Sequence, residues 1–407
     1  MKKYDLVVVG GGISGVAAAV SSAREGLSVL LVEKSGCLGG ALSLSLVFPF
    51  MPFATFSSGE IINDGIFTEM RKRMMEYHDS SYEAYKFVFD DMTTEAGVDV
   101  LFHSSVFEAK TDERLIKSVK IATKSGIIEV CADFFIDTSG DGELIFMTGC
   151  DYQLGRESDG LSQPMTTCFR LSGVDVDLYM KQKPELQEKY KEYREQNKIS
   201  NPRENILTFL GLGDGVVHFN TTRIIKHNPV DAFEVSRAEI IARKQVVEIV
   251  NFLKENSEAF KNSSIISIAN HIGVRESRKL KGVYILKAED IENYVDFEDS
   301  IALGNYGIDI HNPSGTGTRQ FHILGDDYYK IPYRSLLPKE YDNMLVAGRC
   351  LSATHEAHSA VRVMPICACM GEAAGLAIAL AKKTSLNVHT IDVKKLQEKL
   401  KEKNAKF

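Results

Sequence analysis

The chain has 407 residues, of which 44% are apolar and 25% are charged, and its formal net charge is -7 at pH 7. This length predicts two or three domains and a core large enough to bury a big cofactor. The composition is average for a globular protein, and the acidic balance without a basic block argues against a nucleic-acid partner, because phosphate binding needs a concentrated positive surface.

The first thirty or so residues predict a strand, a tight turn, a helix and a second strand. Residues 4–9 are apolar and β-rich, and Gly10-Gly11-Gly12-Ile13-Ser14-Gly15 follows them directly. Apolar residues then recur at helical spacing as far as Gly26, and residues 28–32 form a second apolar run that ends at Glu33. This order is one βαβ unit.

The spacing of Gly10, Gly12 and Gly15 is typical of a dinucleotide-binding loop. Glycine lets the backbone approach a pyrophosphate closely, while the free N–H groups of the helix N-terminus face its negative charge. Glu33 lies 18 residues after Gly15 at a strand end, where its carboxylate can accept bonds from two ribose hydroxyls. We therefore expect a bound dinucleotide; the alternative is a glycine-rich turn without a ligand.

Short elements follow this unit. Residues 36–56 are rich in Gly, Ser and Leu, which indicates a chain crossing a cofactor, and a helix is expected over residues 82–96. The pattern then predicts a β-meander that returns to the parallel sheet, with short strands at residues 98–103, 106–110, 116–122, 127–131 and 133–137.

The character of the sequence changes at about residue 152. Pro184 is expected to open a charged helix that runs to about residue 197, and Ser236 with Glu239 predicts a capping box for a helix to about residue 256. The C-terminal part predicts a buried strand at residues 343–347, a long helix rich in small residues at 365–382 and an amphipathic helix at 392–403.

Two later segments favour FAD over a nicotinamide cofactor. Thr138-Ser139-Gly140-Asp141-Gly142 follows an expected strand and precedes a helix, so it places a second acid near the phosphate and ribitol end of a long cofactor. Residues 343–349, which end in Gly348-Arg349, repeat this arrangement near the C-terminus. A nicotinamide dehydrogenase needs neither segment.

The predicted fold class is therefore α/β. A Rossmann-like FAD-binding domain with a β-meander is expected over residues 1–151 and 330–407, with an α+β substrate domain inserted at residues 152–329.

Motifs in one order along nearly the whole chain carry a family resemblance. They are residues 10–15, 33–34, 38–40, 138–142, 155–157, 163–166, 273–278, 310–313, 331–338 and 347–375. With these motifs the chain resembles the bacterial FAD-dependent oxidoreductase family, which has a glutathione-reductase-like FAD fold and is distantly related to the succinate dehydrogenase and fumarate reductase flavoproteins.

The resemblance implies particular cofactor contacts. Gly39 and Gly40 would let the chain pass the flavin, Val106 would present its backbone to adenine, and Asp141 and Gly348 would bracket the ribityl chain. The other expected contacts are Gly10, Gly12, Ile13, Ser14, Gly15, Glu33, Lys34, Ala41, Ser139, Gly140, Arg349, Arg362, Met364 and Pro365.

The helix expected after Pro365 carries Gly371 and Gly375 four residues apart, a smooth face that permits close packing. Its N-terminus would direct partial positive charge at the N1 and O2 edge of the flavin and stabilise the anionic reduced form. A plain core helix explains the glycines equally well but does not explain a proline in the first turn.

The expected catalytic residues are histidines and an arginine. His355, His358 and Arg362 resemble the His and Arg segment that faces the flavin in the fumarate reductase relatives, but the glycine spacing after them differs, which argues against a dicarboxylate substrate. His311 lies in a sequence that favours a loop, where a histidine is a good proton donor; a structural histidine is the alternative. Arg275 is the fourth candidate, and a structural ion-pair network with Glu276 is its alternative.

Other features limit the range of functions. Seven cysteines form no Cys-x-x-Cys pair and no zinc-like cluster, so no metal site and a reducing, cytoplasmic location are expected. The most apolar stretch, residues 359–381, is interrupted by Arg362, Pro365 and Glu372, which argues against a membrane span.

The expected function is an FAD-dependent oxidoreductase that transfers a hydride between flavin N5 and a small polar substrate, with an external electron donor or acceptor. A homo-oligomer is compatible with the sequence. An NAD(P)-dependent dehydrogenase and a flavin-binding protein with a redox-neutral role are the two alternatives.

Overall fold

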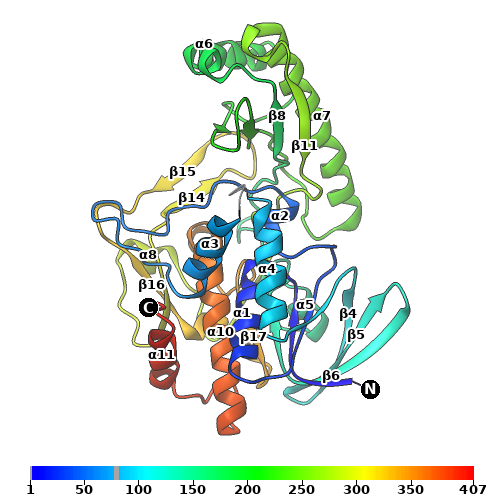
Figure 1. Ribbon diagram of the computed structural model, residues 1–407, viewed down its shortest axis with the longest axis vertical. Helices are drawn as coiled ribbons and strands as arrows, with labels where there is room; N and C mark the ends of the chain where they lie inside the picture. Colours follow the sequence, from blue (N-terminus) through cyan, green and yellow to red (C-terminus); the bar gives the residue numbers. More distant parts are fainter. Residues whose placement is uncertain (1, 78–81) are drawn as a thin grey trace.

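The computed structural model describes residues 2–77 and 82–407 and confirms the expected α/β class, with a Rossmann-like layer and additional antiparallel sheets (Figure 1). The central sheet has seven strands in the order β3-β2-β1-β6-β5-β4, with β17 also paired to β6. Its strands are β1 (Lys2–Val9), β2 (Val29–Val32), β3 (Asp99–Leu101), β4 (Ser105–Asp112), β5 (Leu115–Thr123), β6 (Gly126–Asp137) and β17 (Met344–Val346).

The register of the parallel strands brings their carboxyl ends level. Val9 at the end of β1 lies opposite both Val32 of β2 and Asp137 of β6, and Asp137 in turn lies opposite Val346 of β17. The loops that follow these strands therefore meet at one edge of the sheet, which is where parallel α/β sheets bind ligands. Segments more than 300 residues apart in the sequence become neighbours there.

The expectation of separate strands at 127–131 and 133–137 is wrong, because β6 is one continuous strand of 12 residues. Its first half pairs antiparallel with β5, and its last three residues pair parallel with β17. Ala132, the residue between the expected strands, does not interrupt the ladder and pairs with Tyr4.

Helices cover the central sheet, and α1 and α10 pack directly on each other (Figure 1). A Cβ added to Gly371 would lie 2.1 Å from the Ser14 carbonyl oxygen, and one added to Gly375 would lie 2.4 Å from that of Ala18. The expected close packing of the glycine face is thus confirmed. The helices of this part are α1 (Ile13–Arg24), α2 (Ala41–Leu44), α3 (Ile66–Glu76), α4 (Ala84–Glu95), α5 (Glu143–Thr148), α10 (Met364–Thr384) and α11 (Val393–Glu402).

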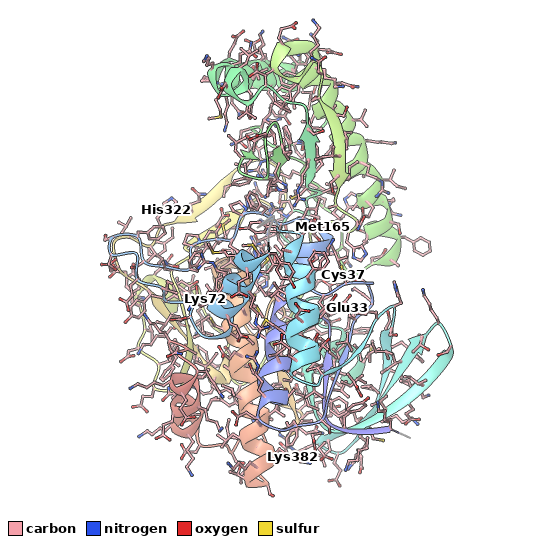
Figure 2. The ribbon with its side chains drawn as sticks, in the orientation of Figure 1. Glu33, Cys37, Lys72, Met165, His322 and Lys382 are labelled. Carbon is pink, nitrogen blue, oxygen red and sulfur yellow. The ribbon has the colours of Figure 1, made fainter. Side chains whose placement is uncertain are left out.

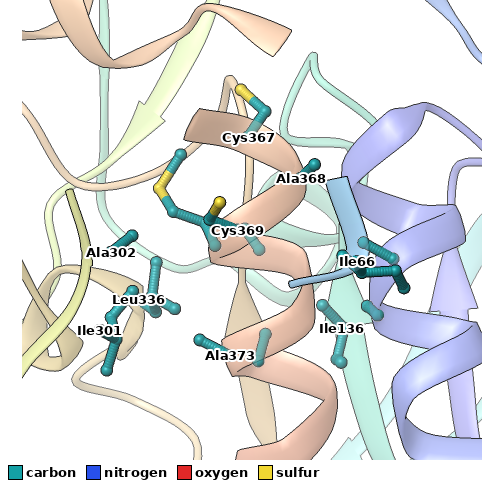
Figure 3. Close-up of a cluster of buried hydrophobic side chains, with 14 of the residues drawn as sticks. Ile66, Ile136, Ile301, Ala302, Leu336, Cys367, Ala368, Cys369 and Ala373 are labelled. Carbon is teal, nitrogen blue, oxygen red and sulfur yellow. The ribbon is translucent and has the colours of Figure 1, made fainter. Parts of the chain in front are cut away.

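The apolar surroundings of α10 are visible in Figure 3, where Cys367, Cys369 and Ala373 lie among aliphatic side chains from other elements. By length and composition alone α10 is apolar enough to cross a membrane, but 94% of its most apolar window is buried inside the protein. Burial of this extent is typical of a core helix.

A second antiparallel sheet of four strands, with two long helices, forms the upper layer in Figure 1. The rings of Phe169 and Phe219 stack in its core with centroids 4.6 Å apart. Its elements are β8 (Phe169–Ser172), β9 (Thr208–Phe209), β10 (Val217–Phe219), β11 (Ser264–Ile268), α6 (Val176–Glu195), α7 (Ala232–Asn256) and the short 3-10 helix η1 (Glu258–Phe260).

Both helix starts expected in this layer are wrong. The N-cap of α6 is Asp175, which accepts a hydrogen bond from Leu178 N–H, and Pro184 lies inside the helix. Pro184 has no N–H, so the Met180 carbonyl four residues earlier has no donor within the helix. Met180 is exposed, so water can supply that hydrogen bond.

The N-cap of α7 is Asp231, five residues before the expected Ser236. The Ser236 hydroxyl instead donates to the Ala232 carbonyl inside the helix, and Glu239 accepts from Ile272 N–H.

Three small antiparallel pairs complete the fold. Buried side chains between Leu286 and Leu337 belong to the same apolar core as α1 and α10, so this core continues across residue 329. The domain boundary expected at residue 329 stays a prediction. The elements are β7 (Tyr152–Leu154) with β12 (Arg278–Leu280), β13 (Ser300–Gly304) with β16 (Tyr329–Pro332), β14 (Ile308–His311) with β15 (Thr318–Phe321), α8 (Ala288–Glu292), η2 (Tyr333–Leu336) and α9 (His355–Val361).

Candidate functional site

A cavity of about 650 Å³ lies at the carboxyl edge of the central sheet and continues toward the upper layer. Most of the residues expected to form the site line it: Gly10, Gly12, Ile13, Ser14, Glu33, Lys34, Gly39, Gly40, Ala41, Val106, Ser139, Gly140, Asp141, Arg275, His311, Gly348, Arg349, Arg362 and Met364. Four of the expected residues are not part of its lining, namely Gly15, His355, His358 and Pro365.

The glycine loop leaves room for a phosphate group at the start of α1. Gly10 has a φ of +100°, and a Cβ on Gly15 would lie 1.9 Å from the Gly10 carbonyl oxygen, so both positions need glycine. A Cβ on Gly12 would meet nothing within 4 Å, because this residue faces open space. The hydroxyl of Ser14 is buried without a hydrogen-bond partner in the part of the chain that the structure describes, and it is available to a ligand.

Glu33 presents a fixed carboxylate to the cavity. One oxygen accepts from Gly11 N–H and the other from Ser35 N–H, both at 2.7 Å, and the side chain is buried. Each oxygen keeps a free lone pair, which is the geometry that two ribose hydroxyls require. Figure 2 shows Glu33 near the middle of the molecule, whereas Lys382, near the C-terminal end of α10, is at the bottom of the view.

Asp141 lies in a compact group of charges along the cavity wall. Arg349 contacts its carboxylate at 2.9 Å, Lys34 at 3.9 Å, and the Ser277 hydroxyl donates to it at 2.9 Å. Burial alone would raise the pKa of Asp141, but the charges of Arg349 and Lys34 lower it. Asp141 is thus a stable anion that hydroxyl groups of a bound molecule can approach.

His355 and His358 lie behind the cavity wall. The Nδ1 atom of His355 is 2.8 Å from Glu276, which is fully buried and also contacts Lys279. His358 Nε2 donates to the Arg349 carbonyl oxygen at 2.7 Å. Neither ring is part of the cavity lining, so the structure places both histidines one layer behind Arg349 and the 273–278 segment, and their catalytic role stays a prediction.

Glu276 is a buried carboxylate that contacts both His355 and Lys279. Although burial would raise the pKa of Glu276, its hydrogen bond to His355 and the charge of Lys279 lower it to about 2. Glu276 does form a buried ionic network, but its partners are His355 and Lys279. Arg275 donates instead to the Pro164 carbonyl and the Thr166 hydroxyl.

His311 is the one expected histidine that lines the cavity. The expectation that it lies in a loop is wrong: it is the last residue of β14, and its side chain is only 12% exposed. Its Nε2 lies 3.4 Å from Asp309, and its Nδ1 lies 3.3 Å from Arg223. Burial and the charge of Arg275 lower the pKa of His311 to about 4, so the ring is neutral at pH 7.

Several lining residues were not anticipated from the sequence. Arg203, Arg223, Tyr306 and Asp309 all face the cavity near His311. The Tyr306 hydroxyl donates to Asp309 at 2.8 Å. The alternation of Asp309 with His311 would have indicated a shared strand face, had residues 308–311 been recognised as a strand. The two arginines lie outside any motif.

Thiols take no visible part in the site chemistry. None of the seven cysteines forms a disulfide within the described residues, and burial raises the pKa of Cys168, which lines the cavity, to about 12. Within residues 2–77 and 82–407 no group of three or more His, Cys, Asp and Glu side chains has the arrangement of a metal site.

One long cavity is lined by the βαβ glycine loop, by the Glu33 carboxylate and by a second loop near the C-terminus. This arrangement is typical of a dinucleotide-binding flavoprotein. The chain belongs to the FAD-dependent oxidoreductase family, whose model matches residues 5–400. It is an enzyme, and FAD is its cofactor. The open cradle at Gly12, the unpartnered Ser14 hydroxyl and the Glu33 carboxylate fit that cofactor.

Solved structures resemble this fold at low sequence identity. A geranylgeranyl bacteriochlorophyll reductase-like protein from Thermoplasma acidophilum is 15% identical, with a TM-score of 0.50 over 99% of this chain and 84% of that one. A flavin-dependent brominase is 12% identical, with a TM-score of 0.47 over 99% and 84% of the two chains. A myxobacterial chondrochloren halogenase is 14% identical, with a TM-score of 0.44 over 98% and 78%. The first of these similarities supports the fold alone.

Proposed function

We propose that this enzyme transfers a hydride between N5 of its flavin and a small polar substrate held beside Arg275, Tyr306 and His311. The observation that carries the proposal is the continuity of one cavity, which runs from Gly12 and Glu33 to these three side chains. When bound, FAD supplies the two-electron chemistry, and the protein supplies binding, orientation and proton handling.

The polar side chains have distinct roles in this proposal. Arg275 orients the substrate, because its guanidinium is held by the Pro164 carbonyl at 2.7 Å and by the Thr166 hydroxyl. His311 is neutral and exchanges a proton with the substrate heteroatom, while Asp309 fixes its ring.

Apolar residues exclude water from the same region. Phe48 and Phe209 line the cavity, and their ring centroids are 6.1 Å apart in an edge-to-face arrangement. A dry wall of this kind favours hydride transfer over side reactions with water.

The N-terminus of α10 completes the proposed arrangement. Met364 lines the cavity, Pro365 lies in the first turn and the helix runs for 21 residues behind them. We assign its partial positive charge to the flavin edge that gains electron density on reduction. We further propose a glutathione-reductase-like type of FAD domain over residues 1–151 and 330–407 and an inserted substrate domain over 152–329. We also propose a cytoplasmic location, which the absence of disulfides among the described cysteines supports.

The experiment that tests this function is anaerobic mixing of the flavin-loaded protein with a panel of metabolites, in both redox directions. Oxidised protein is scanned for loss of the visible flavin band, and light-reduced protein is scanned for its return. At least one compound is expected to change the band stoichiometrically. Turnover of a compound with no change in flavin redox state would instead establish a redox-neutral role.

A further inference from the structure

Four arginines gather around the substrate end of the cavity. We refer to Arg203, Arg223, Arg275 and Arg362 together as the arginine cluster, and all four line the cavity. Only two carboxylates, Glu204 and Asp309, line the cavity beside them. With His311 neutral, the cluster therefore has an excess of positive charge.

Three members of the arginine cluster, Arg203, Arg275 and Arg362, have no ion-pair partner within the described ranges. Arg203 donates to the Asn205 side-chain oxygen at 3.1 Å. Glu204 contacts Arg223 at 3.1 Å, whereas Arg275 and Arg362 donate only to neutral oxygens. Arg362 donates one Nη hydrogen to the Gln163 side chain at 3.3 Å, and its buried Nε has no partner. Asp309 acts on Arg275 and Arg362 through its charge but makes no ion-pair contact with either. Burying a charged group without a contacting counter-charge is costly, and a bound anion would supply that contact.

The electrostatics of Arg275 agree with this geometry. Burial, together with the like charges of Arg362 and Arg203, lowers the pKa of Arg275 to about 9. A bound anion would reverse this shift.

The phosphates of FAD do not explain the cluster. The phosphate end of the cavity has its own positive groups, namely the N-terminus of α1, Lys34 and Arg349, and the two side chains pair with Asp141 and Glu143. The arginine cluster comes from other segments, and its charges act on Asp309 and His311 instead.

We propose that the substrate is a small organic oxyanion, a carboxylate or a phosphate ester, gripped by Arg275 and Arg362 beside the flavin. This inference rests on the proposed function and narrows it. The planar guanidinium fork matches the two oxygens of either group, and the apolar wall at Phe48 and Phe209 accommodates the carbon skeleton.

The test uses the full-length, flavin-loaded protein and probes matched in shape. Lactate and succinate are compared with lactamide and succinamide, and glycerol 3-phosphate with glycerol, by their perturbation of the oxidised flavin spectrum. We expect at least one anion to bind, its neutral analogue to bind at least about tenfold more weakly, and inorganic sulfate to compete.

Variants locate the binding groups. Arg275→Gln is expected to weaken anion binding by about tenfold or more while the FAD content stays at the wild-type value. Arg362→Gln is expected to weaken anion binding by a similar factor; because Arg362 is also an expected FAD contact, its anion affinity is measured on the fraction of protein that holds FAD. Arg243→Gln, on the exposed surface of α7, is the matched control and is expected to change nothing. Arg275→Lys, which keeps the charge but loses the fork, is expected to fall in between.

The outcomes separate this inference from the proposed function. If neutral compounds bind or reduce the flavin and no anion does, the oxyanion inference is wrong and the flavin chemistry stands. If both arginine variants retain FAD and bind the anion as the wild type does, the inference is equally wrong. A protein whose flavin responds to no compound in either redox direction contradicts the proposed function itself.

Discussion

Glu33 and Glu372 are both buried carboxylates, and their partners give them opposite roles. Glu33 accepts two backbone N–H bonds and faces the cavity. Glu372 lies within α10 and accepts one bond from Ile66 N–H at the start of α3. Glu33 therefore offers its oxygens to a ligand, whereas Glu372 has little to stabilise a negative charge.

Replacing Glu33 by Gln should weaken FAD binding by roughly tenfold. The amide has only one acceptor oxygen, so its NH₂ group would face Gly11 N–H or Ser35 N–H. Fluorescence titration of the FAD-free protein with FAD measures the affinity. Glu398→Gln, on the exposed face of α11, is the control, and equal affinities for both variants would argue against the ribose role.

Glu372 makes stability depend on pH. Burial raises the pKa of Glu372 to about 7 in the folded protein, above the ordinary 4.5. The folded state therefore binds more protons than the unfolded state between these two values. This contribution to stability is fully present below pH 4.5 and is lost as the pH rises through 7.

Glu372→Gln should remove this dependence, because the amide oxygen can still accept from Ile66 N–H. At pH 8 the variant is expected to be more stable than the wild type by about 2–3 kcal/mol, with a smaller difference at pH 5. Urea unfolding at both pH values measures the effect, with Glu398→Gln again as control. A constant difference between pH 5 and pH 8 would contradict the assignment.

Residue roles were predictable from the sequence only where a local motif carries them. Gly12 and Glu33 lie within one βαβ unit, so their spacing alone predicted that both would line the cavity; their contacts with FAD stay a prediction. Arg203 and Arg223 belong to loops without a motif, and only the tertiary fold brings them into the cavity lining with Arg275. His355 carried the right chemistry for a catalytic residue, but its burial against Glu276 is a tertiary fact.

At the scale of elements, the close contact between α1 and α10 constrains the packing of the fold. The two glycines of α10 lie directly over carbonyl oxygens of α1, so the helix axes approach without side chains between them. This contact joins the first and last parts of the FAD-binding layer.

Gly375→Ala should therefore destabilise the protein by roughly 1–3 kcal/mol, through overpacking against the Ala18 carbonyl. At an unconstrained helix position the same change would stabilise by up to about 1 kcal/mol. The free energy of unfolding in urea decides the sign. Lys383→Ala, on the exposed end of α10, is the control, and a stabilised Gly375→Ala variant would disprove the packing account.

Element types were predictable because hydrophobic periodicity is local, and the ends were less so. The helix after Ser14 and the one after Pro365 were expected at nearly the observed bounds. The starts of α6 and α7 were misplaced, because Pro184 and Ser236 resemble start signals while the true caps, Asp175 and Asp231, lie further upstream. The short helix α3 was not anticipated.

At the scale of the whole molecule, the cavity is bounded by both ends of the chain and by the upper layer. Residues as far apart as Gly10, Arg203, Arg275 and Met364 line it. A ligand that fills this cavity therefore contacts all of these parts at once.

Removal of FAD should lower the melting temperature by several degrees, because a ligand at one hundred times its Kd adds about 2.7 kcal/mol to stability. Differential scanning calorimetry of the stripped protein, before and after FAD is returned, measures the shift. Return of AMP alone should restore only part of it, since AMP does not reach Arg275. Identical melting curves with and without FAD would contradict a cavity that joins the layers.

The central claim is that a hydride passes between the flavin and a substrate within this one cavity. The most direct measurement uses a reducing substrate from the metabolite panel, with hydrogen or deuterium at its reacting carbon, and compares the anaerobic rates at which it bleaches the flavin. If the reaction runs in the other direction, reduced flavin is reoxidised by the substrate in deuterated solvent. The product is then analysed for deuterium at that carbon. The account predicts a primary isotope effect, or deuterium at that carbon in the product. Product formation while the flavin spectrum stays unchanged would contradict it.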